Sequence, residues 1–202
     1  MNTEGFFRFA FWALIALTLA MRSWYAVRAR HAGERLWPDR ASILREGWGL
    51  FFLRLVIFLL LVGVVVPAFV HPIDSHLSLA LGWRWAGLAL STAGLALWVW
   101  THQTLGRFWS AKLRVRDDHR LIVSGPYAYV RHPMYSAILG WAVGLGLLVA
   151  SWLPLVLAAL AGVLFVGRAP REEKMMIEEF GDNYRTYMKT TGRFLPRWQA
   201  LH

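Results

Sequence analysis

Hydrophobic residues form four long stretches along this chain, and short polar or basic segments separate them. The first three stretches cover residues 6–27, 48–70 and 83–105. A helix needs about 20 apolar residues to cross the hydrocarbon core of a bilayer, so each stretch predicts one membrane-spanning helix. Most charged side chains within them lie close enough to an end to reach the membrane surface. The pattern therefore favours a membrane protein over a soluble one.

The fourth stretch, residues 134–167, contains 34 residues without a charged side chain. A single helix of this length would measure about 50 Å, which is too long for one crossing. The Ser-Trp-Leu-Pro sequence at residues 151–154 divides the stretch and predicts two shorter helices in a hairpin. The expected fold is therefore an all-α integral membrane protein with five transmembrane helices.

The distribution of positive charge predicts the orientation of these helices. Residues 22–46 carry six Arg, residues 107–131 carry six Lys or Arg, and the tail from Arg168 carries seven. Residues 71–82 and 151–154 carry none. Because basic connectors stay on the cytoplasmic side, the N-terminus is expected outside and the C-terminal tail in the cytoplasm. Five spans place all three basic segments on the same side.

The charged segment at residues 171–189 differs from the apolar stretches. Its apolar residues recur at helical spacing: Met175, Met176, Phe180, Tyr184 and Tyr187. This spacing predicts one or two amphipathic helices, broken near Gly181, that lie against the cytoplasmic face.

Composition supports a membrane protein and excludes several kinds of site. The chain is 57% hydrophobic, with a mean hydropathy of +0.41, and it contains no Cys. The lack of cysteine excludes disulfides, thiolate zinc sites and cysteine nucleophiles. The net charge of +10 lies in the connectors and no nucleic-acid-binding pattern is present, so no nucleic-acid partner is expected. His71 and His76 have no third ligand nearby, and no metal site is expected.

The most informative motif lies at residues 125–135, which read Gly-Pro-Tyr-Ala-Tyr-Val-Arg-His-Pro-Met-Tyr. Pro133 suits the first position of a helix, because its missing N–H is not needed there and its φ is already helical. The free N–H groups of that first turn, the helix dipole and Arg131 together favour a bound anion. The motif therefore predicts a polar binding site where a transmembrane helix begins.

Three charged residues near residue 170 have both a structural and a functional interpretation. Arg168 either extends to the membrane surface or clamps a substrate carboxylate with its guanidinium. Glu172 and Glu173 follow Pro170, at an expected helix start. They either complement the helix dipole or serve as acceptors for a ribose diol or an ammonium group.

These motifs together resemble the isoprenylcysteine carboxyl methyltransferase family, whose wider group includes membrane phospholipid N-methyltransferases. The resemblance rests on His119-x-Leu-Ile-Val-x-x-Gly-Pro-Tyr, Arg131-His-Pro-Met-Tyr, Arg168, Glu172-Glu173 and Phe180-Gly-Asp-Asn-Tyr-x-x-Tyr. It covers residues 105–198 and implies an enzyme that uses S-adenosylmethionine, without a metal, in a pocket facing the cytoplasm. Residues 83–202 would then form the methyltransferase core, and residues 1–82 would hold the first two transmembrane helices.

The resemblance also implies roles for individual residues. By their positions in the motifs, the cofactor-binding residues would be His119, Arg120, Leu121, Ile122, Tyr127, Arg131, His132, Pro133, Met134, Tyr135 and Glu172. Arg168 would bind and orient the carboxylate of the substrate. A carboxylate acceptor needs no general base, whereas an amine acceptor would need one, such as Glu173 or His102. The third span lacks a second arginine that could share a carboxylate with Arg168, since Arg107 lies beyond its end.

The expected activity is therefore methyl transfer from S-adenosylmethionine to a lipophilic acceptor, with a carboxylate favoured. The partners would be a prenylated or small lipophilic substrate and membrane lipids, with no obligatory protein partner. Three alternatives stay open: methylation of a phospholipid or other amine, an NADPH-dependent membrane reductase, and a membrane scaffold without catalysis. The short connectors favour the plasma membrane of a bacterium or an archaeon.

Overall fold

The computed structural model describes residues 2–31, 55, 58–59, 77–106 and 121–197. Within these ranges the protein is mainly helical, and a bridge between extended segments pairs Val130 with Gly192. The elements are α1 (Thr3–His31), α4 (Leu81–Leu105), η2 (Gly125–Ala128), α5 (Pro133–Leu148), α6 (Trp152–Phe180) and α7 (Asp182–Thr190). The expected span at residues 48–70 lies almost wholly outside the described residues.

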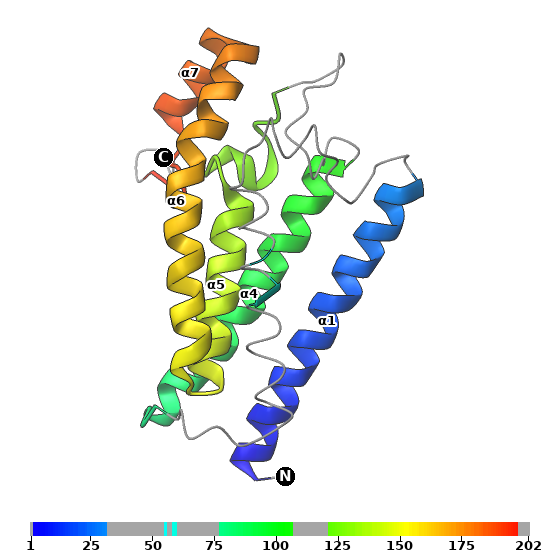
Figure 1. Cartoon of the computed structure of the whole chain (residues 1–202), viewed down its shortest axis with the longest axis vertical. Helices are drawn as coiled ribbons and strands as arrows, with labels where there is room; N and C mark the ends of the chain where they lie inside the picture. Colours follow the sequence, from blue (N-terminus) through cyan, green and yellow to red (C-terminus); the bar gives the residue numbers. More distant parts are fainter. Residues whose placement is uncertain (1, 32–54, 56–57, 60–76, 107–120, 198–202) are drawn as a thin grey trace.

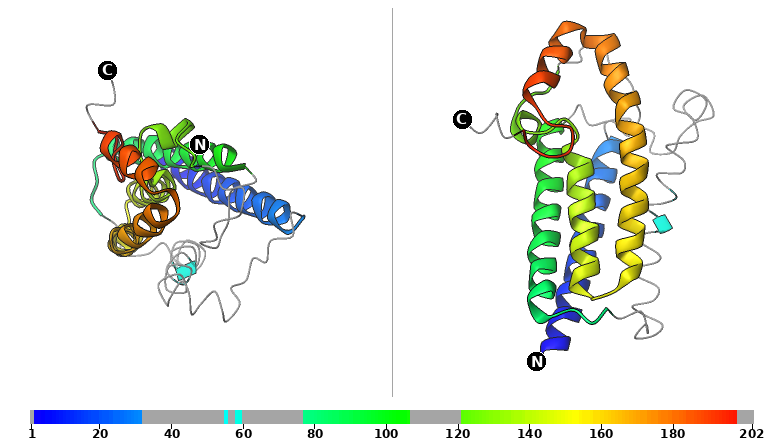
Figure 2. Two further views of the ribbon diagram at one scale, coloured as in Figure 1. Left: turned by 90° about the horizontal axis from the view of Figure 1, so that it is seen from above. Right: turned by 90° about the vertical axis from the view of Figure 1, so that its left-hand side faces the viewer.

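The long helices form an elongated bundle. Helices α4, α5 and α6 run side by side along the long axis, and α1 crosses them obliquely (Figures 1 and 2). Element η2 and helix α7 gather at the end of the bundle opposite the N-terminus (Figure 1). Several polar segments that are far apart in the sequence therefore meet at one end of the apolar helices.

The predicted hairpin in residues 134–167 is confirmed. Helix α5 starts at Pro133, as the motif predicts, and α6 starts at Trp152, directly after the turn. Two helices are long and apolar enough to cross a membrane by length and composition, at Thr3–Arg28 and Trp152–Phe180, and α5 is a shorter apolar helix. The described residues thus agree with an all-helical protein rich in apolar helices, whereas the count of five spans remains a prediction.

Helix α6 corrects one expectation. The sequence predicted a helix start at Pro170, but Pro170 lies inside α6, which continues to Phe180. A proline inside a helix removes one backbone hydrogen bond and usually costs about 3 kcal/mol. Contacts on both sides of it offset that cost, because Arg168 pairs with Glu172 across one helical turn and Glu173 is buried against other segments. Arg168 therefore lies in the middle of a continuous helix and not at its end.

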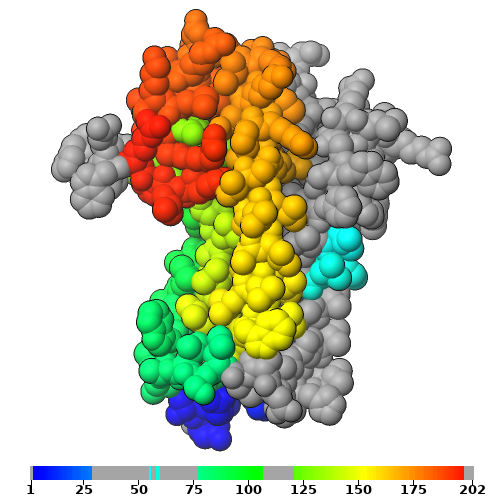
Figure 3. All heavy atoms as spheres, turned by 60° about the vertical axis from the view of Figure 1, so that its left-hand side comes forward, coloured from blue at the N-terminus to red at the C-terminus, as the bar shows by residue number. Residues whose placement is uncertain are grey.

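The helix break near Gly181 is confirmed. Helix α6 ends at Phe180 and α7 begins at Asp182, with Gly181 between them at a φ of 55°. This left-handed conformation favours glycine, and it reverses the direction of the chain. Helix α7 then folds back along α6, as Figure 3 shows in red beside orange. Its buried Tyr184 and Tyr187 thereby face the protein interior.

Helices α4 and α5 pack very closely because small residues line their interface. A Cβ added at Gly94 would lie 2.5 Å from the backbone nitrogen of Trp141, and one at Gly144 would lie 2.3 Å from that of Ser91. Only glycine permits such an approach of two helix backbones. This contact fixes α5, and with it the start of α5 at Pro133, relative to α4.

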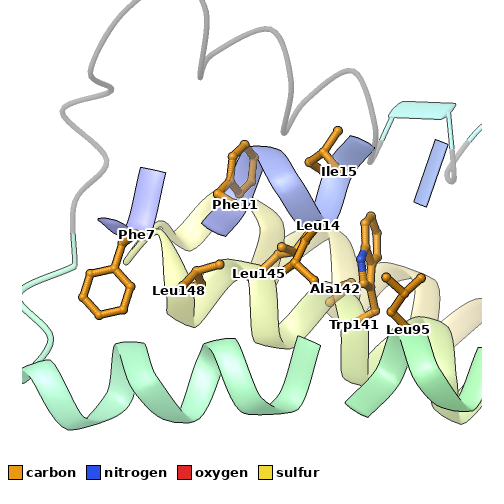
Figure 4. Packing of buried hydrophobic residues seen from close by; sticks show 10 residues of the cluster. Phe7, Phe11, Leu14, Ile15, Leu95, Trp141, Ala142, Leu145 and Leu148 are labelled. Carbon is orange, nitrogen blue, oxygen red and sulfur yellow. The ribbon is translucent and has the colours of Figure 1, made fainter. Parts of the chain in front are cut away.

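Helix α1 joins the same hydrophobic core. Its residues pack against α4 and α5 in one cluster formed by Phe7, Phe11, Leu14, Ile15, Leu95, Trp141, Ala142, Leu145, Leu148 and Ala158 (Figure 4). At the N-terminal end of α1, Glu4 pairs with Arg84 of α4, and the Arg84 Nε donates to the carbonyl of Leu148 at 3.1 Å. Described residues of the two expected parts, 1–82 and 83–202, therefore share one core.

Candidate active site

Three segments build the candidate site at the end of the bundle. Helix α5 supplies its first turn, α6 supplies a stretch from Phe165 to Glu173, and the segment after α7 runs alongside residues 129–132. The backbone N–H of Arg131 donates to Gly192 at 2.8 Å, and that of His132 donates to Arg193 at 3.0 Å. The C-terminal tail is thus fixed against the start of α5.

His132 lies between two carboxylates. Its Nδ1 is 3.4 Å from Glu172 Oε2, and its Nε2 is 3.4 Å from Glu173 Oε1. The side chain is 8% exposed, and its Nε2 makes no hydrogen bond of good geometry within the described chain. Burial acts to lower the pKa of His132, but the interactions with Glu172 and Glu173 outweigh it and raise the pKa above the ordinary value of 6.5. The imidazolium form is therefore favoured.

This raised pKa predicts a pH-dependent contribution to stability. A group whose folded-state pKa is raised stabilises the fold fully below its unfolded pKa, here 6.5, and loses that contribution as pH rises through the folded pKa. We expect the stability difference between wild type and His132→Asn to be largest below pH 6.5 and to shrink above it. Thermal unfolding of both proteins in detergent across this range measures the difference, and a gap that widens with pH would contradict the prediction.

Glu172 connects the imidazole with two further predicted residues. Its Oε1 accepts hydrogen bonds from the Tyr135 hydroxyl at 2.6 Å and from the Arg168 Nε at 2.5 Å. The Tyr135 ring stacks on Phe165, with centroids 4.2 Å apart, and on His132 at 5.4 Å. The result is a polar group of four residues held on one side by aromatic packing.

Glu173 makes a second, separate set of contacts. Its carboxylate accepts from the Arg131 Nε at 2.9 Å and from the Arg193 Nη2 at 2.6 Å, and its side chain is 4% exposed. Arg131 also donates to the carbonyls of Met188, at 3.1 Å, and Thr191. The guanidinium of Arg131 therefore links α6 to the end of α7, and protein acceptors engage it.

The segment before α5 is held in the same way. The Tyr187 hydroxyl of α7 donates to the carbonyl of Tyr127 in η2 at 2.6 Å. Burial, followed by the charges of Tyr187 and Glu172, raises the pKa of Tyr127, so its hydroxyl stays protonated and can donate. In Figure 3 the residues around η2, in yellow-green, are seen between α7 and α6. The charge of Glu172 contributes to the raised pKa of Tyr127, so the two residues interact electrostatically.

The structure places most of the predicted site residues at this end of the bundle. His119 and Arg120 lie outside the described residues. Leu121 and Ile122 are half-buried just before η2, and Met134 is a partly buried neighbour of the cluster that contains Tyr135. Those brought into direct contact are Arg131, His132, Tyr135, Arg168, Glu172 and Glu173.

Two residues of the site, Arg193 and Phe194, were not predicted from the sequence. Arg193 pairs with Glu173, and Phe194 packs against His132 and Tyr135 with ring centroids 5.7 and 6.3 Å apart. The Phe194 carbonyl also accepts a hydrogen bond from Ser136 at 2.5 Å. No local spacing indicated these contacts, since they join residues that are up to 62 positions apart in the chain.

The arrangement suits binding better than acid–base catalysis. Both carboxylates already have cationic partners, and the Arg168 guanidinium keeps N–H donors beyond the one that Glu172 accepts. Among the described residues, no group of three or more His, Asp or Glu side chains is arranged to hold a metal ion. The site is thus a group of polar and partly cationic residues at one end of the apolar helices. It suits the charged groups of lipophilic molecules.

The sequence is similar to one family of known proteins. Residues 87–178 match the model of the isoprenylcysteine carboxyl methyltransferase (ICMT) family. The protein-S-isoprenylcysteine O-methyltransferase of Schizosaccharomyces pombe is 36% identical over 80 residues, which cover 39% of this chain and 34% of the relative. A probable enzyme of the same name from Oryza sativa subsp. indica is 37% identical over 98 residues, covering 46% and 50%. The resemblance seen in the sequence is confirmed.

Two further matches cover larger shares of this chain. The cobalt-zinc-cadmium resistance protein CzcN of Cupriavidus metallidurans is 32% identical over 122 residues, which cover 56% of this chain and 54% of CzcN. The solved structure of a eukaryotic intramembrane Ras methyltransferase, ICMT, is 22% identical with a TM-score of 0.46, covering 75% of this chain and 66% of that one. The chain thus spans about a third to a half of the length of the curated relatives that it matches.

Proposed function

We propose that this chain, in which residues 87–178 carry the core of the isoprenylcysteine carboxyl methyltransferase family, methylates the carboxylate of a lipophilic acceptor with S-adenosylmethionine. The observation that carries the proposal is the contact group of His132, Tyr135, Arg168 and Glu172 at one end of the apolar helices. All four were singled out from the family motifs, although they come from the start of α5 and from α6 and span 41 positions of the sequence.

The residues present fit the methyl donor. S-adenosylmethionine carries an ammonium group, a carboxylate and a ribose diol. Glu172 offers a largely buried carboxylate, and within the described residues its Oε2 contacts His132 at 3.4 Å, which leaves it able to accept from a diol or an ammonium group. The buried Nε2 of His132 makes no well-aligned hydrogen bond in the described chain, so it can donate to an oxygen atom of the methyl donor. Tyr127 and residues 119–122 would complete the site by their motif positions.

The donor, when bound, supplies a methyl group on a positively charged sulfur. The protein holds the donor and the acceptor in the orientation that methyl transfer requires. Arg168 presents a guanidinium that can hold the acceptor carboxylate through paired N–H donors. The packing of Phe165, Tyr135 and Phe194 keeps the surrounding wall apolar and limits the access of water. Holding two reactants in line can contribute roughly 7–11 kcal/mol to lowering the barrier, so no covalent intermediate with the protein is required.

The state of Glu173 favours a carboxylate acceptor over an amine. An amine must lose a proton before it attacks, which calls for a base in the site. Of the two candidate bases, Glu173 and His102, Glu173 belongs to the contact group at the site, but Arg131 and Arg193 both bind its carboxylate. Cationic partners stabilise the anion and make it a poor proton acceptor. A carboxylate is already nucleophilic and needs no such base. The names of the relatives make a prenylated cysteine the first acceptor to test.

The membrane arrangement is part of the proposal. We place five transmembrane helices in the plasma membrane of a bacterium or an archaeon, with the N-terminus outside and the site facing the cytoplasm. The support is that the site lies at the end of the bundle reached by the basic tail, and that α1 and α6 are long and apolar enough to cross a bilayer. Lipophilic acceptors would then reach the site from the inner leaflet.

The proposal predicts two separable effects of mutation. The purified protein is expected to bind S-adenosylhomocysteine, and Glu172→Gln should weaken that binding at least about tenfold, a loss near 1.4 kcal/mol. Arg168→Gln should change this affinity less and instead abolish methylation of a prenylated cysteine acid. Calorimetry measures the first effect. Transfer of labelled methyl groups measures the second, and the product should be released by alkali because it is an ester.

Three results would contradict the proposal. Glu179→Gln is the matched control, because Glu179 is exposed on the same helix, and it should bind S-adenosylhomocysteine like wild type. Equal affinity in Glu172→Gln and Glu179→Gln would remove Glu172 from the site. Alkali-stable methyl groups on lipid amines would favour N-methylation, and preferential thermal stabilisation by NADPH would favour a reductase.

A further inference from the structure

The chain after α7 returns from the far end of the molecule toward the apolar helices. In Figure 2 this tail, in red, comes back to the level at which α4 ends and α5 starts. Hydrogen bonds hold it there, because the carbonyls of residues 192–194 accept from donors of residues 131, 132 and 136. We call residues 189–197 the tail turn. It is thus fixed in place beside the start of α5.

Gly192 permits the tight shape of the tail turn. A Cβ added at this position would collide with the carbonyl oxygen of Leu195 and would lie 3.3 Å from the backbone nitrogen of Arg197. Both are backbone atoms, so no side chain can rotate away to make room, and the close approach requires glycine. The Arg197 Nη1 also donates to the carbonyl of Lys189 at 2.5 Å. The two ends of the tail turn are therefore adjacent, and the residues between them form a compact loop.

Phe194 defines the position of the tail turn along the bundle. Its side chain packs against the buried cluster that includes Tyr135, Ala137 and Ile138, and its carbonyl accepts from the Ser136 hydroxyl at 2.5 Å. All four of these partners belong to the apolar stretch that starts at residue 134. The tail turn therefore lies beside the first turns of a predicted transmembrane helix, which is the level of the proposed membrane surface.

The exposed side chains of the tail turn combine apolar and cationic groups. Leu195 is 77% exposed, more than any other large hydrophobic side chain that is described, and Pro196 beside it is exposed too. Lys189 and Arg197 are exposed at the two ends of the turn. A single exposed leucine is ordinary on a soluble protein. Here it lies on a fixed turn, between two cations, at the level where α5 starts, and this pattern is typical of segments that lie in the interface of a bilayer.

The charges of the tail turn indicate the kind of lipid. Two exposed cations elsewhere on α6 and α7, Lys174 and Arg185, pair with neighbouring carboxylates on their own helices. Within the part of the chain that the structure describes, no ion pair engages Lys189 or Arg197. Their charges are therefore available to the phosphate groups of lipids. Each Lys or Arg near an anionic membrane surface strengthens the contact by about fivefold, so anionic headgroups are favoured over zwitterionic ones.

The tail turn also joins this surface to the proposed site. The Arg193 Nη2 donates to the buried carboxylate of Glu173 at 2.6 Å, and the ring of Phe194 lies 5.7 Å from that of His132. A lipid contact that favours the docked tail would therefore favour the arrangement of these site residues as well. Two ligands that prefer the same state strengthen the binding of each other.

We propose that the tail turn binds anionic lipid headgroups of the inner leaflet through Lys189 and Arg197, with Leu195 in the apolar layer beneath them. The bound lipid then holds the tail against the site and strengthens the binding of the methyl donor. This inference rests on the membrane arrangement and the cofactor site of the proposed function.

The first test measures whether Leu195 enters the bilayer. The chain has no cysteine, so Leu195→Cys provides a single site for an environment-sensitive fluorophore. The full chain is placed in nanodiscs whose lipids carry bromine on their acyl chains, with phosphatidylcholine alone or mixed with phosphatidylglycerol. The label at Leu195 should be quenched, and more strongly with phosphatidylglycerol. A label at Asn183→Cys, exposed at the start of α7, should escape quenching in both.

The second test measures the effect of the lipid on the site. Calorimetry in unbrominated discs should show that wild type binds S-adenosylhomocysteine at least about fivefold more tightly with phosphatidylglycerol than without it. Lys189→Gln combined with Arg197→Gln should keep the affinity seen in phosphatidylcholine and lose this gain. The matched control is Lys174→Gln, an exposed cation of α6, which should keep the gain. Added salt should reduce the gain in wild type, because it screens charges on the surface.

The outcomes separate this inference from the proposed function. A chain that binds no S-adenosylhomocysteine in any disc would reject the cofactor site, while the quenching at Leu195 would still report on the lipid contact. Equal quenching at Leu195 and Asn183 would overturn the lipid contact itself. Quenching at Leu195 that is the same with and without phosphatidylglycerol would overturn the preference for anionic headgroups. A gain in affinity that persists in the double glutamine variant would overturn the role of Lys189 and Arg197.

Discussion

Gly144→Ala is expected to lower the free energy of unfolding by about 1–3 kcal/mol, although alanine is the better helix former. The added Cβ would lie 2.3 Å from the Ser91 nitrogen and 2.8 Å from the Gly87 carbonyl oxygen. Both atoms belong to the backbone of α4, so no side chain can rotate away to make room. The two helices must separate, and the contacts along their interface weaken together. Unfolding in a denaturing detergent series measures the loss.

The same substitution at Gly162 provides the control. Gly162 lies in the apolar N-terminal half of α6, where an added Cβ would meet the Leu139 Cδ2 at 3.7 Å, an ordinary contact distance. Gly162→Ala should therefore be neutral or stabilise by up to about 1 kcal/mol through helix propensity. The two glycine substitutions are expected to act in opposite directions. Equal stability of the two variants would mean that α4 and α5 do not approach as closely as described.

The helices with strong local signals could be predicted from the sequence. Hydropathy located α4 at residues 83–105, within two residues of its observed bounds, and Pro133 marked the start of α5. Both signals are local: apolar length in the first case and the fixed φ of proline in the second. Pro170 carries the same chemical signal and misled the prediction. There, the pair of Arg168 with Glu172 and the burial of Glu173 keep the helix continuous.

The candidate site was predictable only in part, for a related reason. Family motifs identified His132, Tyr135, Arg168 and Glu172, but a motif names residues without showing which of them touch. The two neighbouring glutamates have different partners because their side chains leave α6 in different directions. Glu172 points toward Tyr135, and Glu173 points toward Arg131. Arg193 and Phe194 reach the site because the chain reverses at Gly181 and brings the segment after α7 back to the start of α5. That path depends on contacts across the whole site and not on a local sequence signal.

Glu173→Ala is expected to cost about 3–5 kcal/mol of stability, because it leaves a buried guanidinium without its carboxylate. Arg131 is 6% exposed and cannot turn to water without breaking its bonds to Met188 and Thr191. The contribution of Arg193 is smaller, since its side chain is 40% exposed and solvent screens the pair. Glu178→Ala, at an exposed position on the same helix, should change stability by no more than about 0.5 kcal/mol.

Glu173→Gln distinguishes a positioning role from that of a base. If Glu173 only holds Arg131 and the tail in place, the glutamine variant should lose stability and affinity for S-adenosylhomocysteine together, because the tail carries Phe194 against His132. If Glu173 were the base for an amine acceptor, the variant would bind S-adenosylhomocysteine normally and lose turnover alone. The bonds from two arginines predict the first outcome. Turnover lost at full stability and full affinity would contradict it, and would return the amine to consideration as the acceptor.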